Sequence, residues 1–373
     1  MNNFFKVLHK SKKSKARIGE IKTSHGIIKT PSFVAVGTKG TVKALTPELV
    51  KQIGTQAAFV NTYHLVTHPG AEIIEKAGGI HKYSRLNMPL MSDSGGFQVF
   101  SLAREQRKAD IRGEEQPLVV KISDDGVKFR SAFDGKLIEF TPEKSMEYQR
   151  KIGADINMAF DECTYYPATH EYAEKAMERT HEWLTQCIKF KEDSSSLKQY
   201  LYGVIQGATY KDLRKKSAEF VVSQNTPGVA IGGVSVGESK KEMRDQVKWV
   251  ADYLPKDRPV HLLGVGQVDD IIDLVKYGID TFDCVEPTRL ARMGVIYQVR
   301  GEIDITKNIY KNNLEKVDVD CNCYVCTYFT KSYLHHLFKQ REILGYTLAT
   351  YHNLWTMEKL FERLRDLISK DLV

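Results

Sequence analysis

The sequence lacks the long apolar runs that cross a membrane, because none of its hydrophobic stretches approaches the length of about 18 residues that a spanning helix needs. Its first residues, MNNFFKVLHKSKKSKAR, place the basic side chains after a short apolar patch, whereas a secretory signal places them before it. No Ser-, Gly- or Pro-rich tract marks a flexible linker, and 42% of the residues are hydrophobic, enough for a large core. We therefore expect a folded, soluble and cytoplasmic protein with no membrane partner.

Cysteine is also scarce, with 6 among 373 residues, and its spacing excludes the disulfide framework of a small secreted domain. Three cysteines lie apart, at Cys163, Cys187 and Cys284, and the other three lie together in CNCYVC, which begins at Cys321. This usage is typical of a protein from a reducing compartment.

Strong net charge is absent as well: 54 Lys and Arg face 47 Asp and Glu, a formal charge of +7. Six basic residues are nevertheless close together near the N-terminus: Lys6, Lys10, Lys12, Lys13, Lys15 and Arg17. They form either a solvated basic face or a surface that contacts phosphates, and charge alone does not decide between the two.

Eight short apolar runs recur along the chain and are predicted to be β-strands; they begin near residues 31, 56, 88, 154, 199, 228, 258 and 278. Most of the gaps contain helix-like segments, and the sequences TPEL and TPEK are typical of helix N-termini with proline at the first helical position. Strands that alternate with helices indicate either a parallel barrel or an open doubly wound sheet.

The ends of these runs favour the barrel. Seven of them carry a polar or small residue at the C-terminal end: Asn61, Asp93, Asp161, Gln206, Gly233, Gly264 and Asp283. In a (β/α)8 barrel those ends converge on one mouth, where the active site forms, whereas an open sheet binds its ligand at a single switch point. We predict an α/β protein with a (β/α)8 TIM barrel.

Two segments depart from the barrel pattern. VKISDDGVKFRSAFDGKLIEFTP alternates polar and apolar residues around turn signals and predicts an antiparallel β insertion near residues 105–140. Near the C-terminus a strand-like run, GVIYQVRGEIDI, precedes the cysteine cluster and an amphipathic helix, LWTMEKLFERLRDLISKDL. We predict a catalytic barrel over residues 1–300, with an N-terminal β segment, and a zinc-binding subdomain with a C-terminal helix over residues 301–373.

The cysteine cluster gives the most specific spacing signal. Cys321, Cys323, Cys326 and His352 offer three thiolates and one imidazole, the ligand set that favours tetrahedral Zn²⁺. Four protein ligands leave no position for water, so the predicted zinc is structural. His335 and His336 are the alternative fourth ligands.

Two motifs suggest a pocket for a flat heterocycle. SDSGGFQVFS places Asp93 before two glycines and offers Phe97 as a stacking face, and AFDECT offers Asp161, whose carboxylate can accept from the N1–H and exocyclic amine of guanine. Asp93 is alternatively a turn former and Asp161 a helix N-cap. Gln206 can donate and accept, and Gly233 exposes main-chain amides unless it only permits a tight packing turn.

Asp93 and Asp283 form a candidate catalytic pair. Retaining glycosidic chemistry needs two carboxylates at one mouth, one to attack the anomeric carbon and the other to act as acid and then as base. Cys284 points to the opposite face of its strand by the two-residue period, so we expect Asp283 to react and Cys284 to be structural.

The motifs DSGGFQ, FDEC, QG, GG, VGE, GVG and FDCVEPTR, followed by the Cys/His set, occur in the order found in tRNA-guanine transglycosylases, and NTYHL and YLHHLFKQREILG extend the resemblance across nearly the whole chain. The resemblance to bacterial members implies a zinc-bearing barrel and a homodimer. It also implies exchange of the wobble guanine of tRNAs with GUN anticodons for a 7-deazaguanine, through a covalent tRNA–enzyme intermediate.

The resemblance also implies roles for individual residues. Asp283 would be the nucleophile on ribose C1′ and Asp93 the general acid and base. Phe97 would stack on the base, and Arg289 and Arg292 would hold the anticodon loop. The base pocket would comprise Asp161, Cys163, Gln206, Gly233, Val234 and Gly264.

Four positions depart from the usual bacterial pattern: Val234, Ser235, Glu286 and Met293. Glu286 either lies close enough to Asp283 to repel its charge or points elsewhere. Val234 and Ser235 fall in the segment that lines the pocket for the 7-substituent, while Cys163 matches enzymes that use preQ1, the aminomethyl precursor. We favour preQ1 as the incoming base, with queuine as the alternative.

Three other functions are compatible with parts of the pattern. Non-catalytic partner subunits keep the barrel and the zinc site, but Asp93, Asp161 and Asp283 are all present here. An archaeosine-type enzyme usually carries further C-terminal RNA-binding domains. A barrel glycosidase acting on free nucleosides would leave Arg289, Arg292 and the zinc ligands unexplained.

Overall fold

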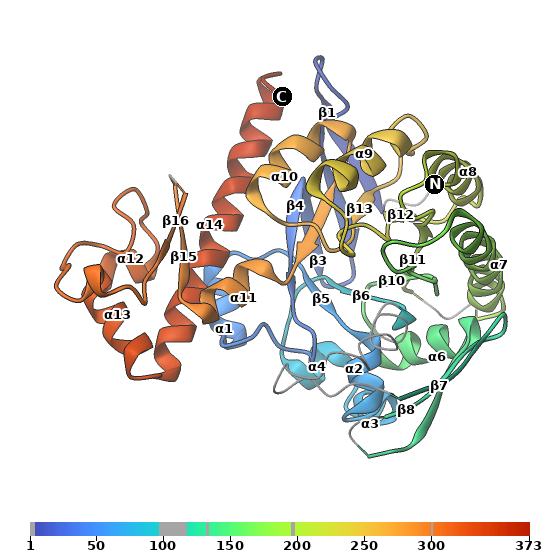
Figure 1. Ribbon diagram of the computed structural model, residues 1–373, viewed down its shortest axis with the longest axis horizontal. Helices are drawn as coiled ribbons and strands as arrows, with labels where there is room; N and C mark the ends of the chain where they lie inside the picture. Colours follow the sequence, from blue (N-terminus) through green and yellow to red (C-terminus); the bar gives the residue numbers. More distant parts are fainter. Residues whose placement is uncertain (1–3, 97–117, 132–133, 195–197, 300) are drawn as a thin grey trace.

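A closed barrel of eight parallel strands forms the centre of the protein (Figure 1). The computed structural model describes residues 4–96, 118–131, 134–194, 198–299 and 301–373. Its barrel strands are β4 (Ser32–Val36), β5 (Ala58–Val60), β6 (Leu90–Ser92), β10 (Ile156–Met158), β11 (Tyr200–Ile205), β12 (Gly228–Ile231), β13 (Val260–Leu262) and β14 (Thr281–Cys284). β14 pairs with β4 and closes the ring, so the predicted TIM barrel is confirmed with all eight of its strands.

Helices follow the strands and surround the barrel, as the alternation predicts. They are α1 (Pro47–Ile53), α2 (Thr62–Thr67), α3 (Ala71–Lys76), α4 (Ile80–Ser84), α6 (Pro142–Ile152), α7 (His170–Asp193), α8 (Lys211–Ser223), α9 (Lys240–Val250), α10 (Val268–Leu274) with the 3₁₀ turn η2 (Val275–Tyr277), and α11 (Glu286–Met293). Thr46 and Thr141 cap α1 and α6 by accepting from the backbone N–H three residues on, and each is followed by proline.

The alternation of side chains along the strands divides the core in two. One group of strand side chains faces the surrounding helices. Phe282 of β14, for example, contacts Phe361 of the C-terminal helix, with ring centroids 5.7 Å apart. The other set fills the barrel interior and includes Val34, Phe59 and Tyr202. Each such fully buried side chain contributes about 1.5–3 kcal/mol.

A three-stranded antiparallel sheet covers the barrel at the N-terminal ends of the strands, and we call this end the floor. It consists of β1 (Phe5–Lys10), β2 (Arg17–Thr23) and β3 (Gly26–Thr30). Ile21 and Ile28 are fully buried against the interior side chains. The opposite end, where the strands reach their C-termini, is the mouth.

Two buried carboxylates at the floor are paired with basic side chains. Asp280 accepts from Arg17 at 3.0 and 2.5 Å, and both side chains are almost fully buried. Asp155 accepts from His25 at 2.8 Å and from His81 at 3.2 Å. His81 Nε2 also lies 3.1 Å from the carbonyl oxygen of Met88, which can only accept, so this nitrogen carries a proton and is not free to bind a metal.

The N-terminal basic residues were expected to form either a solvated face or a phosphate-binding surface, and for two of them the contacts show which groups they bind. Arg17 is buried, and Lys15 donates to the carbonyl oxygen of Ala251 at 2.9 Å and contacts Asp252. Both residues therefore fasten the N-terminal sheet to the barrel and do not form a free phosphate-binding surface.

The predicted antiparallel insertion is present between β6 and α6. Its strands are β7 (Leu118–Ser123), β8 (Gly126–Arg130) and β9 (Leu137–Phe140). Phe129 and Phe140 attach it to the barrel by contacts with Tyr63 and Tyr148, at centroid distances of 5.2 Å in both cases.

The chain after α11 forms the remaining elements. The run predicted as strand-like is a hairpin of β15 (Val295–Gln298) and β16 (Gly301–Asp304), followed by η3 (Asn308–Tyr310), α12 (Tyr324–Tyr328), α13 (Lys331–Lys339) and α14 (Ile343–Ser369). The long helix α14 lies between the barrel and these smaller elements (Figure 1). Among the described residues, no helix combines the length and apolar character needed to span a bilayer.

Candidate active site

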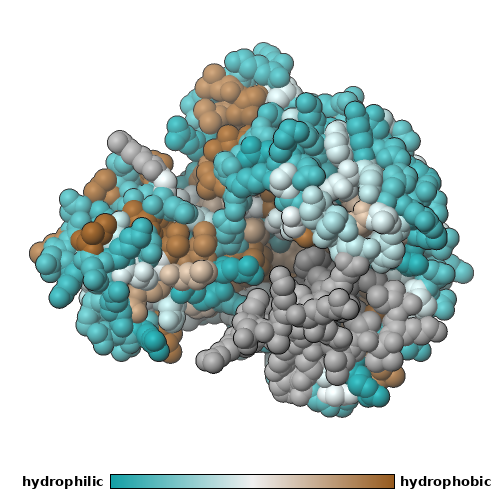
Figure 2. All heavy atoms as spheres, viewed as in Figure 1, coloured by the Kyte–Doolittle hydropathy of each residue, from teal (hydrophilic) through white to brown (hydrophobic). Residues whose placement is uncertain are grey.

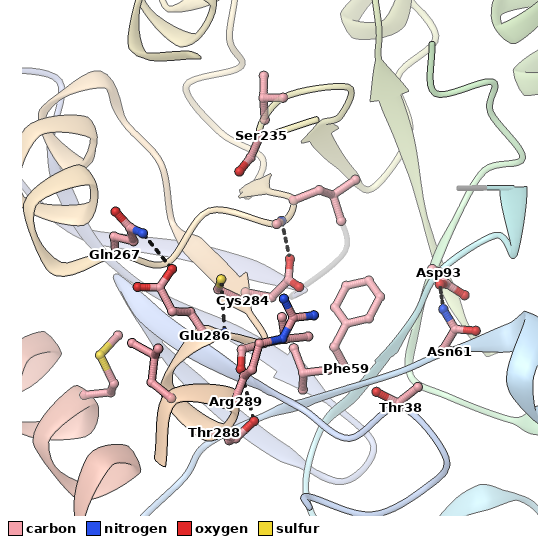
Figure 3. A pocket seen from close by; sticks show the side chains of 18 of the residues that line it. Thr38, Phe59, Asn61, Asp93, Ser235, Gln267, Cys284, Glu286, Thr288 and Arg289 are labelled. Atoms are coloured by element: carbon pink, nitrogen blue, oxygen red, sulfur yellow. Dashed lines mark hydrogen bonds between the residues drawn. The ribbon is translucent and has the colours of Figure 1, made fainter. Parts of the chain in front are cut away.

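A cavity of about 2030 Å³ lies at the mouth of the barrel (Figure 3). It is lined by most of the residues predicted to form the site: Asp93, Asp161, Cys163, Gly233, Val234, Gly264, Asp283, Arg289 and Arg292. Gln206 lies just behind this lining and contacts Asp161. Phe97, predicted to stack on the base, lies outside the described residues.

Asp283 is held by two donors on the same carboxylate oxygen. Its Oδ1 accepts from the backbone N–H of Gly264 at 3.0 Å and lies 3.2 Å from Nε2 of His261. His261 is fully buried in β13, and its other ring nitrogen lies 2.8 Å from the hydroxyl of Thr281. His261 is not among the predicted site residues, although an imidazole in the apolar run RPVHLLGVG is a recognisable signal.

Cys284 lies on the same side of β14 as Phe282 and packs with the outer core. Burial raises the pKa of its thiol to about 12, so the group is protonated at neutral pH. Its Cβ also explains Gly266, because a Cβ added at that glycine would lie 2.3 Å from it. The thiol is therefore a packing group and a poor nucleophile.

Asp93 is half-buried in the cavity wall and, among the described residues, is hydrogen-bonded only to neutral groups. Its Oδ1 accepts from the backbone N–H of Thr62 at 2.7 Å, and its Oδ2 accepts from the side chain of Asn61, which caps α2. Burial raises the pKa of Asp93 to about 7, against the opposing effect of the N–H groups of Thr62 and Gly95. Near neutral pH the group can thus both give and take a proton.

Asp161, a second carboxylate of the cavity, is buried. Its two oxygens accept from Ser94 Oγ at 2.9 Å and from Gln206 Nε2 at 2.7 Å. Burial raises the pKa of Asp161 to about 6, although both hydrogen bonds oppose the shift. These bonds hold the carboxylate in one orientation and leave it lone pairs for further donors.

Gln206 and Gly233 fit together closely. The Oε1 of Gln206 is buried and has no donor among the described residues. A Cβ at Gly233 would lie 2.1 Å from that oxygen, and the glycine has φ +60°, so only glycine is accommodated here. This oxygen lies beneath Gly233 and is closed off from the cavity.

Two charged residues whose roles the sequence analysis missed fix the segment around Gly233. Arg214 is fully buried and donates to the carbonyl oxygens of Gly232 and Gly233, at 2.6 Å each. The carboxylate of Glu238 accepts from the backbone N–H groups of Ser235 and Val236 at 2.5 and 2.9 Å. This segment is consequently held by strong hydrogen bonds on both sides.

Glu286, one of the departures from the bacterial pattern, lies at the rim of the same cavity. Its Oε2 accepts from Gln267 Nε2 at 2.7 Å, so the carboxylate has a neutral partner of its own (Figure 3). Met293, which ends helix α11 just as Glu286 begins it, is 64% exposed.

Helix α11 carries the two predicted tRNA-binding arginines on the cavity wall. Arg289 is exposed, whereas Arg292 is half-buried and donates to the carbonyl oxygen of Thr288 at 2.7 Å. Both guanidinium groups retain donors for an incoming ligand.

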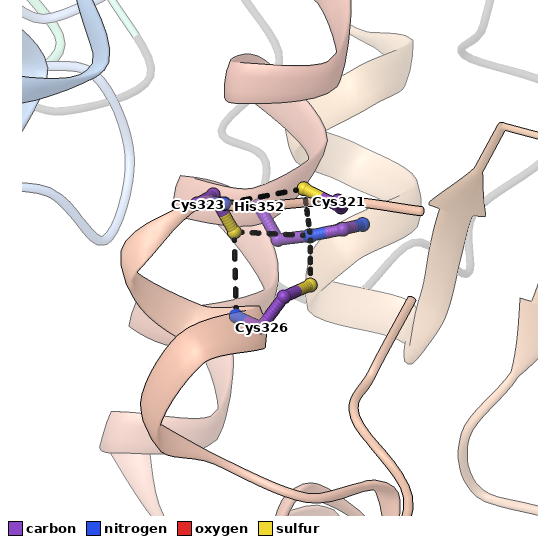
Figure 4. A group of neighbouring side chains, drawn as sticks. All are labelled: Cys321, Cys323, Cys326 and His352. Carbon is purple, nitrogen blue, oxygen red and sulfur yellow. Dashed lines mark hydrogen bonds between the residues drawn. The ribbon is translucent and has the colours of Figure 1, made fainter. Parts of the chain in front are cut away.

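The four predicted metal ligands are neighbours (Figure 4). The sulfurs of Cys321, Cys323 and Cys326 lie 3.9, 3.4 and 3.3 Å from Nδ1 of His352. His352 Nε2 donates to the carbonyl oxygen of Tyr297 at 2.6 Å, which leaves the Nδ1 lone pair directed at the sulfurs. These spacings suit a tetrahedral S₃N site.

The two alternative fourth ligands lie elsewhere. Nδ1 of His335 lies 2.8 Å from the carbonyl oxygen of Ile305, to which it donates, and His336 is exposed on α13. Neither belongs to the cluster of potential ligands. His352 is therefore the histidine that completes the set.

Comparison with known proteins supplies an independent result. The family model described as queuine tRNA-ribosyltransferase matches residues 11–373. The queuine tRNA-ribosyltransferase of Caldanaerobacter subterraneus subsp. tengcongensis is 45% identical over 367 residues, which cover 98% of this chain and 94% of the relative. That of Aquifex aeolicus is 46% identical over 365 residues, covering 96% and 93%, and that of Halothermothrix orenii is 42% identical over 371 residues, covering 100% and 95%.

Proposed function

The chain belongs to the queuine tRNA-ribosyltransferase family and is a pentosyltransferase, and from that premise we propose that it exchanges the wobble guanine of tRNAs with GUN anticodons for a 7-deazaguanine base. The observation that carries the proposal is a pair of carboxylates in different surroundings at one mouth. Asp93 is half-buried, with its pKa raised to about 7 by desolvation, while Asp283 has one oxygen held by two donors. A tRNA substrate is in keeping with a cytoplasmic protein.

The first half of the reaction removes guanine. An oxygen of Asp283 attacks ribose C1′, and the C1′–N9 bond breaks with its electron pair going to the base. Asp93 in its protonated form gives its proton to the departing guanine. The products are free guanine, an ester between C1′ and Asp283, and ionised Asp93.

The second half installs the new base. Asp93 takes the N9 proton of the incoming 7-deazaguanine, and N9 attacks C1′ as the bond from C1′ to Asp283 breaks. Both carboxyl groups return to their starting states, so the exchange is ping-pong. The pKa of about 7 at Asp93 supports both of its roles, because neither protonation state is costly at neutral pH.

Base recognition is proposed to rest on polar groups behind Gly233. Asp161 would accept from N1–H and the exocyclic amine, and Gln206, which donates to Asp161, would read the base together with it. Cys163, Val234 and Gly264 line the surrounding wall. Phe97 remains the proposed stacking residue.

We favour preQ1 over queuine as the incoming base. Val234 is only 5% exposed, and the neighbouring N–H groups of Ser235 and Val236 are tied to Glu238. A small aminomethyl substituent needs less room beside this segment than a cyclopentenediol does, which is why we favour preQ1.

Binding of tRNA and dimerisation complete the proposal. Arg289 and Arg292 at the rim would contact phosphates or unpaired bases of the anticodon loop. A homodimer is supported by large hydrophobic side chains exposed after α11, such as Leu314, Tyr328 and Ile343. Figure 2 shows hydrophobic atoms gathered on the C-terminal part of the molecule, while the barrel helices are mostly hydrophilic outside.

A structural zinc ion is proposed at Cys321, Cys323, Cys326 and His352. The metal would join the loop before α12 to α14, and so hold residues 301–373 as a unit against the catalytic barrel of residues 1–300. Elemental analysis of protein purified without chelator should give one zinc per chain. Protein without zinc would contradict this assignment.

The test is exchange of labelled guanine into a GUN-anticodon tRNA, followed by separate chases with preQ1 and queuine. We expect label to enter, and preQ1 to remove it faster than queuine does. A tRNA that binds but never takes up label would favour the alternative of a non-catalytic partner subunit. A free nucleoside that competes with tRNA would favour a nucleoside glycosidase.

A further inference from the structure

A fully buried histidine lies beneath Asp283, inside the barrel. The parallel pairing of β13 with β14 sets His261 opposite Thr281, and the alternation of inward-facing residues adds Asp283 to the same group. The ring of His261 stacks on Phe59, with centroids 5.6 Å apart and planes inclined by 21°. Its two nitrogens face Thr281 Oγ1 at 2.8 Å and Asp283 Oδ1 at 3.2 Å.

The chemistry of these groups determines where the protons lie. An ionised carboxylate can only accept, so Nε2 of His261 carries the hydrogen that Asp283 receives. The hydroxyl of Thr281 lies 2.8 Å from Nδ1 and can donate or accept, so it holds the ring in this orientation.

Both donors to Asp283 use the same oxygen. Gly264 N–H and His261 Nε2–H converge on Oδ1, and none of the residues that the structure describes donates to Oδ2. Two fixed donors restrict rotation of the carboxylate about its Cβ–Cγ bond. Oδ2 is consequently the oxygen left free of hydrogen bonds and the better nucleophile.

We propose that His261, oriented by Thr281, is a positioning residue that presents Oδ2 of Asp283 to ribose C1′; the inference rests on the proposed function. When the ester forms on Oδ2, Oδ1 becomes its carbonyl oxygen and keeps both donors. When the ester breaks, the returning negative charge is shared with Oδ1, where the same hydrogen bonds stabilise it. His261 thus assists both halves of the exchange without touching the substrate.

The test compares three substitutions in the full-length protein, with guanine exchange into tRNA as the readout. His261→Phe keeps a ring against Phe59 but removes the donor, and we expect kcat to fall about 100-fold, with the KM for tRNA within about twofold of the wild-type value. His261→Gln restores an N–H donor and should recover at least about tenfold of that loss. Thr281→Val removes the hydroxyl that orients the ring and should lower kcat about 10-fold.

A second assay measures how much tRNA–protein ester each variant accumulates on denaturing gels. Asp283→Asn, which should form no ester, is the reference. Thermal unfolding shows which variants fold. If His261→Phe does not fold, Thr281→Val, in which the two side chains have similar volumes, tests the inference in its place. Wild-type kcat in His261→Phe, or equal kcat in the Phe and Gln variants, would overturn the inference while the proposed function stands. Wild-type protein that exchanges no guanine would overturn both.

Discussion

The floor and the mouth of the barrel treat carboxylates in opposite ways. The segments of β10 and β14 each carry one aspartate at either end: Asp155 and Asp280 at the floor, Asp161 and Asp283 at the mouth. The floor pair is bound to Arg17, His25 and His81. The mouth pair accepts hydrogen bonds from Ser94, Gln206, Gly264 and His261.

The difference separates groups that stabilise the fold from groups kept reactive. Burial alone would raise the pKa of Asp155, but hydrogen bonds from His81 and His25 hold it below its usual range. Asp161 has no cation beside it in the part of the chain that the structure describes, and burial raises its pKa to about 6. A carboxylate beside a fixed cation is a weaker base, so the environment of Asp161 differs from that of Asp280, which is paired with Arg17.

The sharpest way to break the comparison is to remove one carboxylate from each end of β14. Asp283→Asn should lower guanine exchange by about 10⁴-fold, as loss of a covalent nucleophile does, with little change in the urea midpoint of unfolding. Full exchange by this variant would contradict the role given to Asp283. Asp280→Asn is the matched control. The molecules of this variant that remain folded should keep an intact cavity and therefore their guanine exchange.

Stability should respond to the floor pair. Arg17→Met leaves the buried charge of Asp280 without its partner, and such losses cost about 3–5 kcal/mol. Urea unfolding at pH 7 measures the change. The double variant Arg17→Met/Asp280→Asn should be less destabilised than the sum of the single changes, because the pair is coupled. Additive effects would count against a coupled pair.

The two environments also predict opposite responses to pH. The folded pKa of Asp161 is about 6, above the unfolded value of about 3.9, so the unfolded chain ionises first and the free energy of unfolding falls as pH rises from about 4 to 6. Asp161→Asn removes this loss and should be more stable than wild type at pH 7 by on the order of 2 kcal/mol, with no advantage at pH 4.

Asp155 provides the matched case with the opposite sign. Its folded pKa is lowered, so its contribution is present above about pH 3.9 and is lost as pH falls through the folded value. Asp155→Asn should therefore be less stable than wild type at pH 7 and converge on it in acid. Unfolding curves at several pH values that gave both variants the same slope would contradict the contrast.

The smallest effects are expected from basic side chains at the surface. Lys15→Ala removes the contacts with the carbonyl of Ala251 and with exposed Asp252, and should lower stability only slightly, with no effect on tRNA affinity. Arg289→Ala at the mouth should instead weaken tRNA binding and reduce its dependence on salt. Filter binding at two salt concentrations distinguishes the two positions.

The barrel could be predicted because its information is local. Each of the eight strands is a short apolar run between turn signals, and six of the seven residues predicted at the strand ends line the cavity at the mouth. Cys321, Cys323 and Cys326 were likewise recognisable from their spacing, and the predicted fourth ligand, His352, is the histidine that α14 brings to the sulfurs.

Long-range partners could not be predicted in this way. Arg17 and Asp280 are 263 residues apart, and neither neighbourhood shows that they meet. His261 reaches Asp283 only through the register of β13 on β14, which pattern analysis does not supply. Arg214 is similar: its buried guanidinium is satisfied by carbonyl groups whose positions exist only in the folded loop.

The pairing of β14 with β4, in which Asp283 lies opposite Val34, has a consequence for assembly. A slip of one residue would turn the thiol of Cys284 toward the interior in place of the carboxylate. The same slip would draw Asp280 away from Arg17 and leave both charges buried alone. A barrel closed in the wrong register would thus be inactive and also short-lived, since quality-control proteases remove chains that open readily. Errors in building the active site would therefore be discarded with the misfolded protein.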